Sequence, residues 1–239
     1  VLITAASYPS VKDAGSAFDQ MVEEMPEGVL EMMGAADGLT TPAGYLNSQL
    51  YSNVFPIVLL IFGISAAAWS IAGSEREGTL ESLLANPVHR WRVALERLTG
   101  IALLLAVLTF VATALLAALR SPFELDDLGI GALTAAGVAT FLLALLFTGI
   151  TYAIGAATGS KGWAIAGGAG LATATYVLFG LSSLVDFFEN VRWASPWYWL
   201  LQPSPLADGW TFQAIGAPLL VVVPVAAIGT ALFTRRDLT

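Results

Sequence analysis

Five long runs without any Asp, Glu, Lys, Arg or His constrain this chain more than any other feature. They are Leu50–Ala72, Leu98–Leu119, Leu128–Ile154, Trp163–Val185 and Gln213–Phe233. Each run exceeds twenty residues, and a helix rising about 1.5 Å per residue needs about 20 residues to cross a hydrocarbon core of about 30 Å. Charged residues make up only 12% of the chain, against about a quarter in a soluble domain. The sequence therefore predicts an all-α polytopic transmembrane helical bundle.

The chain before the first complete run has an apolar start and then an acidic stretch. We expect Val1–Ala6 to be the end of a preceding span. Residues 10–38 carry seven carboxylates against Lys12, with apolar residues at helical spacing, which predicts amphipathic helices on the outer membrane surface. We divide a single transmembrane domain, residues 1–239, into this opening part (1–48) and a five-span bundle (49–239).

The basic residues orient the bundle. One inter-span loop and the C-terminal tail hold Arg76, Arg90, Arg92, Arg97, Arg235 and Arg236, whereas the alternate loops hold only Arg120 and Arg192. Because loops rich in Lys and Arg stay in the cytoplasm, we expect that loop and the C-terminus to be cytoplasmic. The acidic N-terminal segment and an aromatic segment at residues 186–212 then lie outside. This predicts a multi-pass protein of the plasma membrane.

The cytoplasmic stretch Ser74–Arg92 is the only dense run of mixed charge between two spans. Ser74 and Glu77 have the spacing of a capping box, which begins a helix. Three leucines fall on one face of that helix, and Glu77 and Glu81 share another. Asn86 before Pro87 ends it. The pattern predicts a short amphipathic helix over residues 74–86. The simpler interpretation is a loop whose charges only keep it in water.

Four motifs in this order resemble a known family. They are Thr41-Pro-Ala-Gly-Tyr-Leu-Asn; Glu75-Arg-Glu-Gly-Thr-Leu-Glu with Leu83-Leu-Ala-Asn-Pro-Val and Arg90; Ser195-Pro-Trp-Tyr-Trp with Pro205-Leu; and Arg235-Arg-Asp-Leu. Their order over nearly the whole chain resembles the ABC-2 type transporter permeases. No motif among them is catalytic, so the resemblance identifies a family and not a substrate.

The resemblance implies partners and a coupling surface. In that family the loop after the second span carries a coupling helix that docks on a separate ATPase subunit, which binds the ATP and Mg²⁺. Two permease subunits, identical or homologous, assemble with two such ATPase subunits. The implied coupling residues here are Glu75, Arg76, Glu77, Gly78, Thr79, Glu81, Pro87 and Arg90. The apolar, uncharged spans suggest export of a hydrophobic or amphipathic compound.

The outer segment at residues 186–212 is rich in aromatic side chains. Amphipathic rings prefer the headgroup level, so an aromatic belt accounts for most of them. The functional alternative is an outer gate made by short re-entrant helices, with Trp193, Trp197, Tyr198 and Trp199 as its residues. The belt is the favoured interpretation.

Several other patterns point away from chemistry within this chain. Gly155–Lys161 resembles a phosphate-binding loop, but the spacing is one residue short and a span precedes it instead of a strand. We expect a short turn there and no ATP site.

In the fourth span, Ala164 with Gly168 and Ala166 with Gly170 have the spacing of close helix packing. The chain has no cysteine and one histidine, His89, so we expect no catalytic residue, metal or cofactor.

Two other classes of function stay open. Uncharged spans disfavour a proton-coupled carrier, since such carriers need ionisable groups within the membrane. An ATP-independent carrier or channel is still an alternative, and so is a structural membrane protein that recruits a cytoplasmic partner. Nucleic-acid binding has no support, because no basic patch exists.

Overall fold

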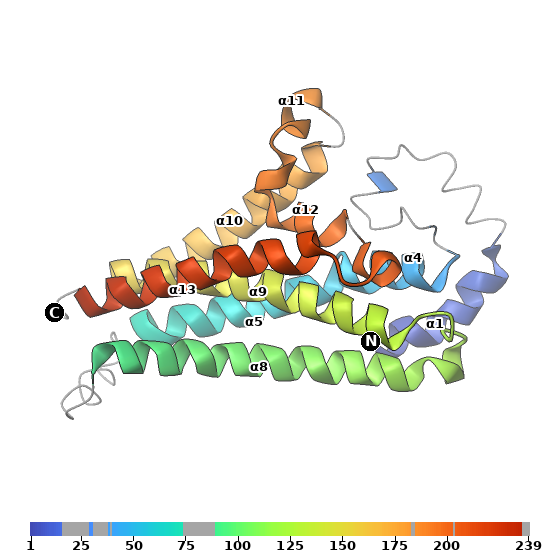
Figure 1. Ribbon diagram of the computed structural model, residues 1–239, viewed down its shortest axis with the longest axis horizontal. Helices are drawn as coiled ribbons and strands as arrows, with labels where there is room; N and C mark the ends of the chain where they lie inside the picture. The colour runs from blue at the N-terminus through green and yellow to red at the C-terminus, as the bar shows by residue number, and fades with distance from the viewer. Residues whose placement is uncertain are drawn as a thin grey trace. The chain divides into compact units, whose positions relative to one another are not determined.

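The computed structural model describes residues 1–15, 29–30, 38, 40–73, 89–182, 185–202 and 204–235. This part of the chain contains helices and no strand (Figure 1). Five helical segments in it are long and apolar enough to cross a membrane: Pro42–Gly73, Arg90–Leu119, Ile130–Thr158, Lys161–Ser182 and Phe212–Arg235. The predicted all-α polytopic fold is confirmed.

The helices do not begin and end at the same residues as the apolar runs predicted from the sequence. The first segment joins α4 (Pro42–Leu46), α5 (Val54–Ala68) and two π-helical turns, η1 (Asn47–Tyr51) and η2 (Trp69–Gly73). The others are α8 (Arg90–Leu119), α9 (Ile130–Thr158), α10 (Lys161–Ser182), and η6 (Phe212–Gly216) leading into α13 (Ala217–Arg235). The first segment begins at Pro42 and α8 at Arg90, each well before the predicted Leu50 and Leu98, because polar and charged turns before the apolar runs are helical too.

The chain forms two compact units. One comprises Val1–Ile57, Leu108–Leu143 and Thr175–Pro218, and the other comprises Val58–Val107, Ala144–Ala174 and Leu219–Thr239. Below we call them the first and the second unit. The boundary between them falls within each of the five long helical segments, so both units are built from parts of the same helices.

In the first unit, α1 (Leu2–Asp13) packs on α4 through two tyrosines. Tyr8 Oη donates a hydrogen bond to the Thr40 carbonyl at 3.0 Å, and Tyr45 Oη donates to the Thr4 carbonyl at 3.1 Å. The two rings lie 5.3 Å apart. Burial raises the pKa of Tyr8. The apolar start of the chain is thus part of a helix that continues to Asp13.

An ion pair connects α1 to the loop before α9. Lys12 Nζ lies 2.7 Å from Glu124 Oε2, and this hydrogen bond raises the pKa of Lys12. Glu124 has a left-handed backbone, with φ of 56°, at the end of the turn η3 (Ser121–Phe123). The amphipathic helices predicted for residues 10–38 otherwise fall mostly outside the described residues.

In the second unit, α9 is the central helix (Figure 1). Tyr152 is fully buried and its Oη donates to the Ala94 carbonyl of α8 at 2.7 Å. Gly229 of α13 lies against the Tyr152 ring, and Gly63 of α5 lies against Thr148. The most apolar window of α9 is 61% buried, against 17% for α13. Within this unit, α5, α8 and α13 each contact α9.

Candidate functional site

The aromatic segment is a series of short helical turns in the first unit. It comprises α11 (Asp186–Glu189), η4 (Arg192–Ala194), α12 (Pro196–Leu201) and η5 (Ser204–Asp208). Ser195 has an extended backbone, with ψ of 122°, because a residue before proline avoids the α region. Pro196 then occupies the first position of α12, which its fixed φ favours. Local sequence therefore sets the turn that redirects the chain here.

One face of α12 is fixed to the end of α10. Ser195 Oγ donates to the Thr175 carbonyl at 2.7 Å. The Trp197 ring, only 3% exposed, meets the Tyr176 ring edge-on at 4.9 Å. Edge-to-face aromatic pairs of this kind stabilise by about 0.5–1.5 kcal/mol beyond their buried area. Trp197 is therefore an anchor of the segment.

A second set of contacts ties the exposed side of the segment together. The Arg192 guanidinium lies 5.1 Å from the centre of the Tyr198 ring, a cation–π contact. Trp199 Nε1 donates to the Trp193 carbonyl at 2.8 Å, and Trp193 Nε1 donates to the Asn190 carbonyl at 3.1 Å. The four aromatic residues predicted for an outer gate thus belong to one folded segment, although their exposure differs.

The exposed rings suit the headgroup level of a bilayer. The most exposed aromatic side chains of residues 185–216 are Phe187 (75%), Phe212 (74%), Trp193 (66%) and Trp210 (58%). Rings with this exposure favour the aromatic-belt interpretation for these four positions. Phe212 is not among the residues predicted for this segment, although it follows Trp210 by two residues. A gate role for Trp193, Trp197, Tyr198 and Trp199 stays a prediction.

Most predicted coupling residues lie outside the described residues, as does the helix predicted over residues 74–86. They are Glu75, Arg76, Glu77, Gly78, Thr79, Glu81 and Pro87. Arg90 is described, and it is the first residue of α8. A basic side chain at a helix N-terminus opposes the helix dipole. Arg90 therefore gives α8 no dipole stabilisation.

The stretch Gly155–Lys161 forms the predicted turn between two spans. Helix α9 ends at Thr158, Gly159 has a left-handed backbone with φ of 63°, and α10 begins at Lys161. The Gly159 amide donates to the Gly155 carbonyl at 2.9 Å, which closes the end of α9. A helix occupies the place where a phosphate-binding loop has a strand. Among the described residues, no three His, Asp or Glu side chains gather to hold a metal ion.

The two small-residue pairs of α10 differ in their surroundings. Ala164 and Gly168 are buried, Ala164 beside Gly155 and Gly168 against Thr151, both on α9. Ala166 and Gly170 are exposed, and a Cβ added to Gly170 would meet nothing within 4 Å. The first pair packs within this chain.

Comparison with known protein families identifies a match. A family model described as "ABC-2 family transporter protein" matches residues 4–238. No curated protein and no solved structure matches the chain. The match includes all five long helical segments and the charged stretch between the first two of them.

Proposed function

The chain belongs to the ABC-2 family of transporter proteins, and from this premise we propose that it is the permease subunit of an ATP-driven exporter. A separate ATPase subunit supplies the energy, and two permease subunits form the path through the plasma membrane. The observation that carries this proposal is the family match over residues 4–238. The cargo we propose is hydrophobic or amphipathic, because the central parts of the long helices carry no Asp, Glu, Lys, Arg or His.

We place the coupling surface on the charged stretch between the first two long helical segments. Its residues are Glu75, Arg76, Glu77, Gly78, Thr79, Glu81, Pro87 and Arg90. ATP binding closes the ATPase pair, and the segment at residues 74–86 passes that movement to the spans. Arg90 connects this stretch to the described structure, because it is also the first residue of α8.

Purification in mild detergent tests the proposed function. The chain should bring down a stoichiometric partner that carries a Walker A sequence, and ATP hydrolysis should appear only with that partner. The chain alone should bind no ATP, because Gly155–Lys161 is a helix–turn–helix corner. Lys161→Ala should leave transport nearly unchanged. ATP bound at one per isolated chain, or solute movement without any ATPase, would contradict the proposal.

Single cysteines test the proposed orientation, since the chain has none of its own. Asp208 and Lys161 are both exposed, at the end of η5 and the start of α10. In intact cells an impermeant thiol reagent should label Asp208→Cys and should reach Lys161→Cys only after permeabilisation. The expectation follows from the excess of arginine on the Lys161 side. The reverse labelling pattern would overturn the orientation.

A further inference from the structure

A buried tyrosine joins three helices of the second unit. Tyr152 of α9 is fully buried, and its Oη donates a hydrogen bond of 2.7 Å to the Ala94 carbonyl of α8. Gly229 of α13 lies against the same ring, where an added Cβ would come within 3.1 Å of Tyr152 Cδ1 and 3.3 Å of Ala153 Cα. The ring therefore packs directly on the backbone of α13 and has no room to swing in that direction.

The hydrogen bond from Tyr152 meets α8 close to its start. Helix α8 begins at Arg90, at the end of the charged stretch, and Ala94 lies about one turn further on. Val93 and Ala94 are buried. Arg97 is partly buried and lies close enough to Tyr152 to act on it electrostatically. This face of the first turns of α8 is therefore directed towards α9.

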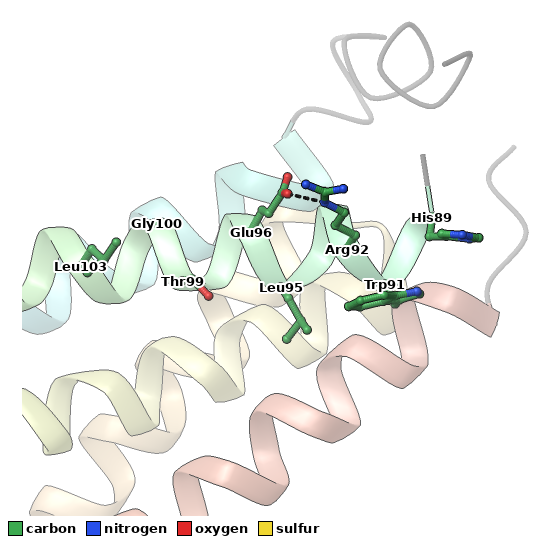
Figure 2. Close-up of a pocket in the computed structure, with 8 residues that line it drawn as sticks. All are labelled: His89, Trp91, Arg92, Leu95, Glu96, Thr99, Gly100 and Leu103. Carbon is green, nitrogen blue, oxygen red and sulfur yellow. Dashed lines mark hydrogen bonds and ion pairs between the residues drawn. The ribbon is translucent and has the colours of Figure 1, made fainter. Parts of the chain in front are cut away.

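The opposite face of these turns is exposed. Figure 2 shows Leu95 and Glu96 there, with the ion pair between Arg92 and Glu96, 2.8 Å long, running along α8 itself. Trp91 is 52% exposed and Leu95 40%. The first turns of α8 are thus held to the second unit from one side, which is the side that Tyr152 contacts.

A hydrogen bond resists sliding more than apolar contacts do. Side chains such as Val93 keep much of their buried area when two helices shift by a fraction of a turn, because apolar burial is non-directional. The Tyr152 hydroxyl would lose its acceptor in such a shift, and an unpaired buried hydroxyl costs free energy. Displacement of the start of α8 is therefore disfavoured unless α9 moves with it.

We propose that Tyr152 transmits movement of the charged stretch to α9. This role rests on the proposed function, in which the ATPase pair moves that stretch. A displacement enters α8 at Arg90, reaches the Ala94 carbonyl one turn later, and moves α9 through the Tyr152 hydroxyl. Tyr152 is a positioning residue, since it is fully buried and acts through the two helices.

Spin labels on α8 and α9 test this role. Leu95→Cys and Ala157→Cys place one label at an exposed position of each helix, in a chain that has no cysteine of its own. The labelled permease is kept with its ATPase, and pulsed electron paramagnetic resonance gives the distances between the labels with and without ATP and vanadate. With Tyr152 in place the two helices should move together, so ATP should leave these distances unchanged.

Tyr152→Phe removes the hydroxyl and keeps the buried ring. With ATP and vanadate, the population in which α8 is displaced from α9 should rise about fivefold, the factor that corresponds to the net free energy of one hydrogen bond. Tyr8→Phe is the matched control, because Tyr8 is also buried and its Oη also donates to a backbone carbonyl, that of Thr40. The control should leave the distances as they are in the labelled chain without it.

Two results would overturn the role of Tyr152. One is the same response to ATP with and without Tyr152→Phe. The other is an equal rise of the displaced population in Tyr8→Phe, which would show that loss of any buried hydrogen bond loosens the helices. In both results the ATPase is bound, so the proposed function stands. A chain that co-purifies with no ATPase contradicts the proposed function itself, and co-purification before labelling detects that case.

Discussion

Gly168→Leu is expected to lower the yield of folded protein sharply, whereas Gly170→Leu, two residues further along α10, is expected to leave it unchanged. A Cβ at Gly168 would collide with the Thr151 hydroxyl and lie 3.0 Å from its Cβ. Thr151 cannot turn away freely, since it is fully buried and its Oγ1 donates to the Phe147 carbonyl at 2.7 Å. Overpacking of this kind typically costs about 1–3 kcal/mol and occasionally more.

The measurement is the fraction of each variant that stays monodisperse in mild detergent after heating. Gly170→Leu is the control, because it adds the same side chain to the same helix in open space; exposed changes of that sort stay within about 0.5 kcal/mol. Gly168→Ala should lower the amount of folded protein less than Gly168→Leu does. Adding Thr151→Ala to Gly168→Ala should restore part of that amount, because it removes the hydroxyl that the new Cβ meets. Equal losses at positions 168 and 170 would show that α10 does not pack on α9 through Gly168.

The small residues of α10 show how far the sequence could specify packing. Both pairs have the same four-residue spacing, and that spacing predicts a close helix contact without saying which pair makes it. The choice depends on Thr151 and Gly155, which α9 presents to Ala164 and Gly168. Which face of α10 makes the close contact is therefore decided by α9, and the small-residue spacing within α10 does not contain that information.

The bounds of α8 show a second limit of sequence patterns. The predicted span began at Leu98 because hydropathy falls where charges begin. The helix itself begins at Arg90, since the backbone hydrogen bonds of a helix do not depend on side-chain charge. Arg92 and Glu96, four residues apart, form an ion pair that supports these turns. The sequence therefore predicts the apolar part of α8 that crosses the membrane, but not the residue at which the helix begins.

The aromatic segment was predictable as a region but not in its details. Its composition predicts a location at a membrane surface. The outer-gate alternative included short helices, and the structure contains α11 and α12 there. The burial of Trp197 could not be inferred, because α12 has only six residues and is too short for a clear amphipathic period. The contact with Tyr176 of α10 decides which ring is buried.

Charge reversal by Glu77→Arg with Glu81→Arg is expected to weaken ATPase docking about a hundredfold, because like charges brought together at an interface cost several kcal/mol. Both glutamates lie outside the described residues, so this expectation rests on the predicted helix and on the coupling role proposed for it. Reversal of solvated charges contributes little to stability, so the amount of folded permease should stay the same. Leu84→Asp should instead lower that amount, since the leucine face is predicted to seat the helix.

A second acidic pair makes the comparison specific to one side of the membrane. Asp126 and Asp127 are exposed in the loop before α9, which the proposed topology puts outside. Asp126→Arg with Asp127→Arg changes the net charge by the same amount and should leave docking intact. The measurements are ATPase co-purification and substrate-stimulated hydrolysis, each normalised to folded permease. If the reversal at Glu77 and Glu81 keeps full docking and full stimulation, the stretch is only a solvated loop, and energy must enter the permease through another surface.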